Sequence, residues 1–143
     1  MASPAPVLVD TNVWSRLFAA QKQPHPEVAS WRAVLVGRPV VIAAQTRGEL
    51  LFGAHLNGWG IDRIAQYRTL LDNFTVLHPT PAVVEEWAVL RAECSRLGHP
   101  LQAKPNMGDA WIAATARAFR LPLLSADQVF RGVPNLELLP AAP

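Results

Sequence analysis

Short apolar runs alternate with amphipathic stretches from one end of the chain to the other. The apolar runs predict strands over residues 7–9, 40–43, 74–77 and 121–125, with a final candidate over 136–139. Apolar positions at helical spacing predict helices over residues 11–20, 27–36, 46–57, 61–71, 81–97 and 109–120. Proline and glycine residues fall between these segments and end them.

The predicted strands contain almost no polar residues, which indicates that helices cover both faces of the sheet. Strands that alternate with helices in this way predict an α/β fold, here a three-layer α/β/α sandwich around a mostly parallel central sheet. A chain of 143 residues that is 50% hydrophobic can bury about two thirds of its unfolded surface. Because no repeat or linker is visible, residues 1–143 are expected to form one domain.

The helix predicted over 81–97 has the clearest boundaries in the chain. Thr80 is placed to cap its first turn, Pro81 suits the first helical position, and Gly98 is placed to end it. One apolar stripe is predicted to face the core, formed by Val83, Trp87, Leu90, Cys94 and Leu97. Cys94 is therefore interpreted as a core residue and not as a nucleophile.

Charge and cysteine content limit the classes of protein to which the chain could belong. The net charge is +2, and eleven of the thirteen cationic residues are Arg, whose planar fork suits phosphate oxygens. Nucleic acid is thus a permitted partner. One cysteine excludes an intrachain disulfide framework. Residues 1–6 show no signal-peptide pattern and no apolar run is long enough for a membrane span, so a cytoplasmic protein with no membrane partner is expected.

Four of the eleven acidic residues occupy special positions in this predicted fold. Asp10 directly follows the first strand, and Asp127 lies two residues after the strand over 121–125. Glu49 and Asp109 fall in the opening turns of helices. In open α/β sheets the carboxyl ends of the strands and the first turns of helices meet at one crevice. We therefore expect the four carboxylates to converge.

Each acid also has a purely structural interpretation. Residues 46–49 match a capping box, in which Glu49 would only satisfy backbone N–H groups. Asp109 suits the helix dipole, Asp10 suits a helix cap and Asp127 suits a turn. Taken singly, each structural interpretation is favoured over catalysis. The conjunction of all four at one edge favours a functional site.

The electrostatic cost of gathering the acids indicates what they would bind. Two carboxylates about 4 Å apart repel by roughly 4 kcal/mol at an effective dielectric constant of 20. No lysine lies near each acid to neutralise it, whereas a divalent cation would do so. Oxygen ligands select Mg²⁺, with Mn²⁺ as a substitute, over zinc. Such ions support phosphodiester hydrolysis by activating water and clamping phosphate oxygens.

With these positions identified, the chain resembles the PIN-domain ribonucleases, and most closely the VapC-type toxins of bacterial toxin–antitoxin pairs. Four segments carry the resemblance, in the order and spacing of the family's motifs: Val7–Asn12 with the first Asp, Glu49–Ala54 with the Glu, Asp109–Ala116 with the third acid and Leu123–Phe130 with the fourth. No single motif is specific. Together they extend over nearly the whole chain.

The resemblance implies a Mg²⁺-dependent endoribonuclease that cleaves tRNA or rRNA and inhibits translation. It implies a homodimer and a cognate antitoxin protein. It makes Asp10, Glu49, Asp109 and Asp127 the catalytic residues and metal ligands. Thr11, Asn12 and Ser125 are expected to support the acids through hydrogen bonds, with ordinary capping as the alternative for these three residues.

The sequence departs from the family pattern at one place. Many relatives have Asn directly before the third acid, whereas here Gly108 precedes Asp109 and Asn106 lies three residues before it. The shape of the 104–108 segment and any role of Asn106 therefore stay open. Five basic residues are expected near the acids and are candidate RNA contacts, with a solvated face as the alternative: Arg16, Arg47, Lys104, Arg117 and Arg131.

Other protein classes fit the sequence less well. A haloacid-dehalogenase phosphatase would have a second Asp two positions after Asp10, where this chain has Asn12. A receiver domain would have an early acidic pair, and a zinc hydrolase would have clustered histidines. The serious rival is a PIN-like module that binds RNA or protein without cutting, and the presence of all four acids argues against that rival.

Overall fold

The protein folds around a five-stranded parallel sheet with the strand order β3-β2-β1-β4-β5. The structure, a computed structural model, describes residues 4–140; the outermost residues of the expected domain, including part of the 1–6 segment, lie outside it. The strands are β1 Val7–Val9, β2 Val40–Ala43, β3 Thr75–Leu77, β4 Leu123–Leu124 and β5 Leu138–Leu139. Leu8 of β1 pairs with Val41 on one side and with Leu123 on the other, so β1 is the central strand.

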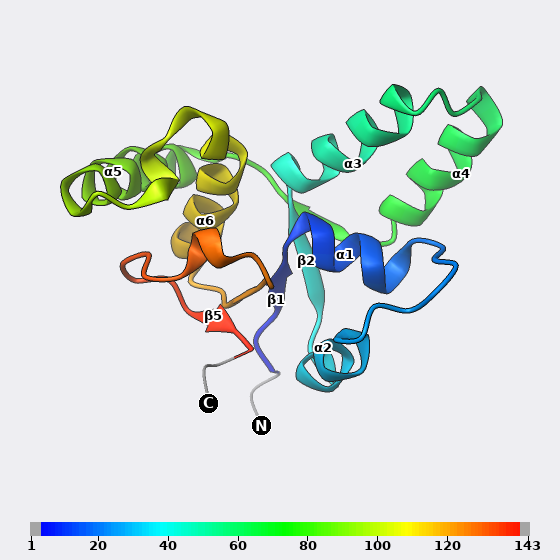
Figure 1. The fold of residues 1–143 in the computed structure, drawn as a ribbon, viewed down its shortest axis with the longest axis horizontal. Helices are drawn as coiled ribbons and strands as arrows, with labels where there is room; N and C mark the ends of the chain where they lie inside the picture. The colour runs from blue at the N-terminus through cyan, green and yellow to red at the C-terminus, as the bar shows by residue number, and fades with distance from the viewer. Residues whose placement is uncertain (1–3, 141–143) are drawn as a thin grey trace.

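Within residues 4–140, six helices connect and cover these strands (Figure 1). They are α1 Thr11–Phe18, α2 Val28–Leu35, α3 Ala44–Leu56, α4 Ile61–Leu71, α5 Pro81–Leu97 and α6 Met107–Phe119. Short 3₁₀ turns lie at Pro100–Gln102 (η1), Lys104–Asn106 (η2) and Gln128–Phe130 (η3). All strands and helices predicted from the sequence are therefore present, and the three-layer α/β prediction is confirmed.

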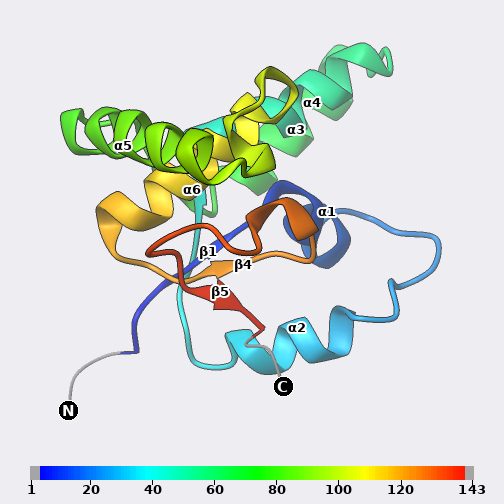
Figure 2. The same ribbon diagram turned by 60° about the vertical axis from the view of Figure 1, so that its left-hand side comes forward.

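Alternate residues of the strands face opposite helical layers. Leu8 packs into a core cluster with residues of α5 and α6, such as Leu90 and Ile112. Its neighbours Val7 and Val9 pack into a second cluster that includes Trp14 of α1 and residues of α2, α3 and α4. This is the two-residue side-chain period of a strand, with both faces buried. Figure 2 shows β1, β4 and β5 lying between α6 and α2.

The ends of several helices and strands differ from the prediction, chiefly where no capping side chain is present. α3 begins at Ala44 and α6 begins at Met107, each two residues earlier than predicted, and neither has a side-chain N-cap. α5 begins at Pro81 as predicted, because the Thr80 hydroxyl accepts a hydrogen bond from the Val83 amide. The strand predicted over 121–125 is reduced to Leu123–Leu124, since pairing with β5 covers only these two residues.

The apolar stripe of α5 was predicted correctly except at its end. Val83, Leu90 and Cys94 are buried, whereas Leu97 is 65% exposed because it is the last residue before the cap at Gly98. Burial raises the pKa of the Cys94 thiol, which favours the unreactive neutral form and agrees with a core role. Within residues 4–140, none of the helices has the length and apolar character to cross a membrane.

Candidate active site

Asp10 lies where the central strand ends and α1 begins. Its backbone N–H donates to the carbonyl oxygen of Leu124 in β4 at 3.0 Å, which ties it to the sheet. Its side chain caps α1 by accepting from the backbone N–H of Asn12 at 3.3 Å. Asp10 is only 4% exposed, and this burial raises the pKa of its carboxyl. The capping role and a place in an acidic site therefore coexist.

Ser125 connects Asp10 to the segment of Asp127. The Ser125 hydroxyl donates to Asp10 Oδ2, and its oxygen accepts from the Asp127 backbone N–H at 3.0 Å. Asp127 in turn caps η3, since its Oδ1 accepts from the Val129 amide at 3.0 Å. The turn role predicted for Asp127 is thus present, and the same turn holds this exposed carboxylate beside the end of β4.

Glu49 reaches the same edge from α3. The Thr11 hydroxyl donates to Glu49 Oε1 at 2.8 Å and lies 3.1 Å from the hydroxyl oxygen of Thr46. Thr46 is fully buried inside α3, which begins at Ala44, so it cannot cap the helix. The capping-box interpretation of residues 46–49 is therefore wrong. The structure joins Glu49 instead to Thr11, the residue that follows Asp10.

Asp109 lies in the first turn of α6 and responds to the charges of the other three acids. Burial and the negative charges of Asp10, Asp127 and Glu49, in that order, raise its carboxyl pKa from 3.8 to about 6. Burial also raises the pKa of the Glu49 carboxyl, against a smaller opposite effect of the Thr11 hydrogen bond. Four segments that are distant in sequence thus bring their carboxylates within electrostatic range of one another.

The chemistry of the four side chains suits a hard divalent cation, because all the donors are oxygens and the net charge is strongly negative. Their present placement is not that of a formed metal site: within residues 4–140, no three Asp, Glu, His or Cys side chains are grouped to hold one ion. Asp10, Glu49 and Asp127 each direct at least one oxygen to a protein hydrogen-bond donor. A cation would need side-chain rotations to draw the carboxylates together.

Two of the four histidines, His25 and His99, have partners outside the acidic site. His25 stacks on Trp31 with ring centroids 5.1 Å apart. His99 accepts from the Leu101 amide through Nδ1 at 3.0 Å, and its Nε2 lies 2.6 Å from the Arg131 carbonyl oxygen. Both rings therefore have structural partners.

Two residues at the site were missed by sequence reasoning. Gln45 lies beside the Glu49 side chain and opposes the rise in its carboxyl pKa, and Thr46 contacts Thr11. The first has a signal in the sequence, since residues four apart share one face of a helix. The second had none, because the capping-box pattern assigned Thr46 to a helix end.

Gly108 accounts for the departure from the family pattern. A Cβ atom at this position would lie 2.8 Å from Gln45 Nε2 and 3.4 Å from Glu49 Oε2. The absence of a side chain therefore makes room for Gln45 beside the carboxylate. Asn106 points elsewhere, because its amide donates to the carbonyl oxygen of Pro100 at 2.8 Å and so fixes the turn before α6.

The basic residues divide into paired and exposed ones. Arg117 was a candidate RNA contact, but its side chain is 6% exposed and bridges Glu86 at 2.9 Å and Glu93 at 3.1 Å. Arg117 is therefore a structural residue that joins α6 to α5. Arg47 pairs with Asp72 at 2.9 Å. The other three candidates, Arg16, Lys104 and Arg131, are exposed.

Comparison with solved structures places this fold among toxin–antitoxin proteins. The chain is similar to FitAcB from Neisseria gonorrhoeae, with 24% identity, a TM-score of 0.74, and coverage of 92% of this chain and 95% of that one. It is similar to VapBC2 from Rickettsia felis bound to a promoter DNA fragment, with 18% identity, a TM-score of 0.72, and coverage of 92% and 96%.

A third similar structure is VapBC-5 from Mycobacterium tuberculosis, with 26% identity, a TM-score of 0.63, and coverage of 94% and 96%. Among curated protein sequences, none matches this chain significantly. The family model described as PIN domain matches residues 7–136, a range that contains all four acids. The chain therefore belongs to the PIN-domain family, and its fold is of the kind found in VapBC toxin–antitoxin complexes.

Proposed function

We propose that this protein is a Mg²⁺-dependent endoribonuclease, with Mn²⁺ as a substitute ion, that acts in the cytoplasm as the toxin of a type II toxin–antitoxin system. PIN domains are generally nucleases and usually use divalent metals. The observation that carries the proposal is the Asp109 carboxyl, whose pKa of about 6 reflects burial beside three other acids. A fold that places four carboxylates within electrostatic range of one another in spite of their repulsion is suited to gather them around a cation.

The four acids would hold the ion, among which Asp10 is buried, Glu49 and Asp109 are half-buried and Asp127 is exposed. When bound, the ion would supply activation of water and stabilisation of charge on the phosphate. Ser125 would fix the orientation of the Asp10 carboxylate, and Thr11 would fix that of Glu49. Attack by water requires no ribose 2′-hydroxyl, so the products would carry 5′-phosphate and 3′-hydroxyl ends.

The similar structures are VapBC and FitAB antitoxin complexes, and this similarity supports an antitoxin partner. A free ribonuclease in the cytoplasm would be harmful, and a cationic side chain of the partner would suit the acidic site. We further propose that the chain forms a homodimer and that its substrate is a structured RNA, tRNA or rRNA, whose cleavage stops translation.

A second candidate is a PIN-like module that binds RNA or protein without cutting. The observation in its favour is that the described side chains are not grouped around a metal position. The two candidates differ in whether added cation produces cleavage, since a binding module would stay inactive in Mg²⁺.

The test is incubation of purified protein with total RNA in Mg²⁺ or in excess EDTA. Asp10→Asn is the inactive variant, and Glu85→Gln, at an exposed position of α5, is the matched control. The proposal predicts cleavage by wild type and by Glu85→Gln in Mg²⁺ only, with 5′-phosphate ends. Cyclic phosphate ends, or undiminished cleavage in EDTA, would contradict the metal mechanism. Absence of cleavage in all samples would favour the binding module.

A further inference from the structure

A pocket of about 540 Å³ opens beside Glu49, between α3, α6 and the segment that follows β3. We propose that this pocket binds one unpaired nucleobase of the RNA, next to the phosphate that is cut. The inference rests on the proposed function and adds to it a base-binding subsite, and with it a source of sequence preference that the acids alone would not supply.

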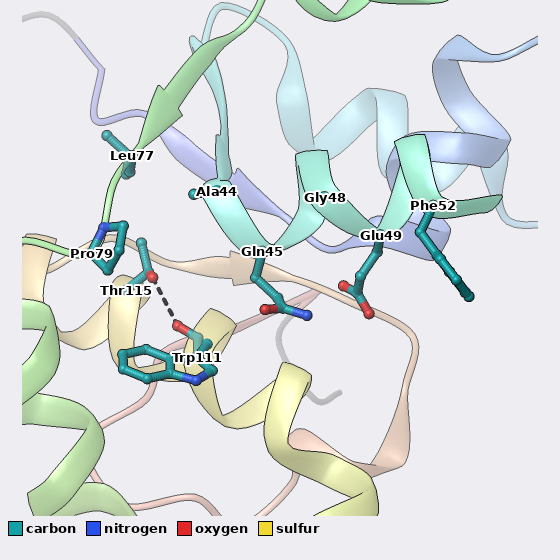
Figure 3. A pocket seen from close by; sticks show the side chains of 9 residues that line it. All are labelled: Ala44, Gln45, Gly48, Glu49, Phe52, Leu77, Pro79, Trp111 and Thr115. Carbon is teal, nitrogen blue, oxygen red and sulfur yellow. Dashed lines mark hydrogen bonds between the residues drawn. The ribbon is translucent and has the colours of Figure 1, made fainter. Parts of the chain in front are cut away.

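The pocket is built from one face of α3 and the facing side of α6. Gln45, Glu49 and Phe52 are spaced so that they project from the same side of the helix, as Figure 3 shows. Trp111 of α6 lies opposite them, and Pro79 closes one end. The cavity volume falls in the range of small-ligand sites, about 300–1,000 Å³, and exceeds what one base needs.

Aromatic side chains give the pocket a surface for stacking. The Trp111 indole is held against that of Trp87, with ring centroids 4.8 Å apart and an angle of 11° between the planes. The Arg91 guanidinium lies over the Trp87 ring at 4.9 Å, which fixes the stack further. Phe52 is 64% exposed at the pocket edge. Proteins bind unpaired bases by stacking them on aromatic side chains, and rings that are already held in place suit this role.

The charges of the lining exclude other ligand classes. Among residues 4–140, no Lys or Arg lines the pocket, and the one charged residue in its lining is Glu49. A phosphate or a carboxylate would therefore meet repulsion and find no cation. A nucleobase is flat, aromatic and uncharged, so it meets neither problem.

The polar groups of the pocket favour a base over an apolar side chain of a partner protein. The Thr115 hydroxyl is already bonded to the Trp111 carbonyl oxygen at 2.8 Å. The Gln45 amide, which also lines the pocket, offers two N–H groups and one carbonyl oxygen. An apolar side chain would cover these groups without pairing them, at a cost, whereas a base edge offers both donors and acceptors.

The position of the pocket ties the base to the reaction. Glu49 belongs both to the acidic site and to the pocket lining. A base seated against Trp111 or Phe52 would thus belong to a nucleotide adjoining the phosphate held at the acids. The pocket requires that base to be unstacked, so single-stranded loops are the part of a structured RNA that fits.

Binding of defined oligonucleotides tests the subsite without knowledge of the cut sequence. The protein is the full chain carrying Asp10→Asn to prevent cleavage, in Mg²⁺. The probes are fluorescent eight-nucleotide RNAs of A, U or C and an abasic oligomer of equal length and charge, measured by anisotropy. The variants are Phe52→Ala, Phe52→Tyr, which keeps a ring, and Leu56→Ala as a matched control, one turn further along α3, 72% exposed and outside the pocket lining.

The subsite predicts that the base-bearing probes bind more tightly than the abasic one. Phe52→Ala should lower the affinity for the base-bearing probes about fivefold or more, from the usual free energy of base stacking. It should leave the affinity for the abasic probe unchanged. Phe52→Tyr should bind as the parent protein does, and so should Leu56→Ala. Equal affinity for base-bearing and abasic probes would overturn the proposal, as would equal losses in Phe52→Ala and Leu56→Ala. If Phe52→Ala loses the binding of a protein partner but keeps its affinity for RNA, the pocket would be assigned to that partner instead.

The cleavage assay on total RNA separates this result from the fate of the proposed function. Wild-type cleavage in Mg²⁺ together with base-independent binding would overturn only the subsite. Absence of cleavage would overturn the nuclease proposal itself.

Discussion

The hydroxyl of Ser125 donates a hydrogen bond to the buried carboxylate of Asp10, 115 residues earlier in the chain. β4 lies directly beside β1 in the sheet, which brings the two residues together at the ends of neighbouring strands. Because the Ser125 oxygen also accepts from the Asp127 amide, one small side chain positions two of the four acids. The orientation of the first acid thus depends on the last motif of the chain.

Ser125→Ala should lower both stability and activity. The substitution removes a hydrogen bond to a buried charged group, which typically stabilises by about 1.5–3 kcal/mol, so a fall in Tm of several degrees is expected by calorimetry. In the Asp10→Asn background the same substitution should matter less, since the charge is gone. Equal effects in both backgrounds would show that Ser125 does not act through the Asp10 carboxylate.

Asp109 should make the metal-free protein less stable as pH rises. Its pKa is about 6 in the folded protein against 3.8 ordinarily, so the folded state binds the proton more tightly. Its stabilising effect is therefore present below about pH 4 and is lost as the pH rises through about 6. The raised pKa values of the Asp10 and Glu49 carboxyls act in the same direction.

Asp109→Asn tests this pH dependence. The shift corresponds to at most about 3 kcal/mol, and screening at a half-buried group reduces it to about 1–2 kcal/mol. In EDTA at pH 7.5 the variant should melt several degrees above wild type, with the difference shrinking toward pH 4. Added Mg²⁺ should raise the Tm of wild type but not of the variant. A variant that melts lower than wild type at pH 7.5 would contradict the charge-repulsion argument.

Gly108→Ala should reduce activity without reducing stability. The new methyl group would meet the flexible end of Gln45, which can move aside, and alanine favours the helix. Gln45 would leave its place beside the Glu49 carboxylate, which itself lies 3.4 Å from the new methyl group, so the rate of RNA cleavage should fall while Tm stays the same or rises. Gln45→Ala alone should lower the rate similarly, and the double variant should be no worse than either. If the double variant instead lost as much cleavage rate as the two single variants combined, Gly108 and Gln45 would act independently of each other.

Arg117→Met should destabilise the protein but leave RNA binding unchanged. The substitution leaves Glu86 and Glu93 without their buried partner, and because these two carboxylates are 35% and 26% exposed, solvent screening reduces the cost below that of a fully buried pair, to about 1–3 kcal/mol. The salt dependence of RNA binding should be that of wild type, since Arg117 would contact no phosphate. A smaller salt slope in the variant would restore Arg117 as an RNA contact.

The sequence was sufficient for the fold because its strands are nearly pure apolar runs and several boundaries carry their own marks, such as Thr80 and Pro81 before α5. The place of Asp10 was predictable for a related reason: it directly follows a strand, and parallel strands end at one edge. The supporting contacts were not. The start of α3 has no capping side chain, so the Thr46–Glu49 pattern was mistaken for one.

Side-chain contacts between helices could also not be predicted from the sequence. Arg117 looked available for RNA because its partners lie on α5, 31 and 24 residues away along the chain, and only the packing of α6 against α5 brings them together. The close approach of Gly108 to Gln45 likewise depends on how near α6 comes to α3. Such distances are set by the three-dimensional packing and have no periodic signal.

The most direct measurement of the central claim is the rate of cleavage of one RNA substrate in Mg²⁺ by five single variants. Four replace Asp10, Glu49, Asp109 and Asp127 by their amides, and the fifth is the exposed control Glu85→Gln. If the four acids form one metal-dependent site, each of the four amide variants should lose about a hundredfold or more in rate, from the usual size of such catalytic contributions, while Glu85→Gln should cut like wild type. Retention of the wild-type rate by the amide variants would contradict the assignment of the active site to these four carboxylates.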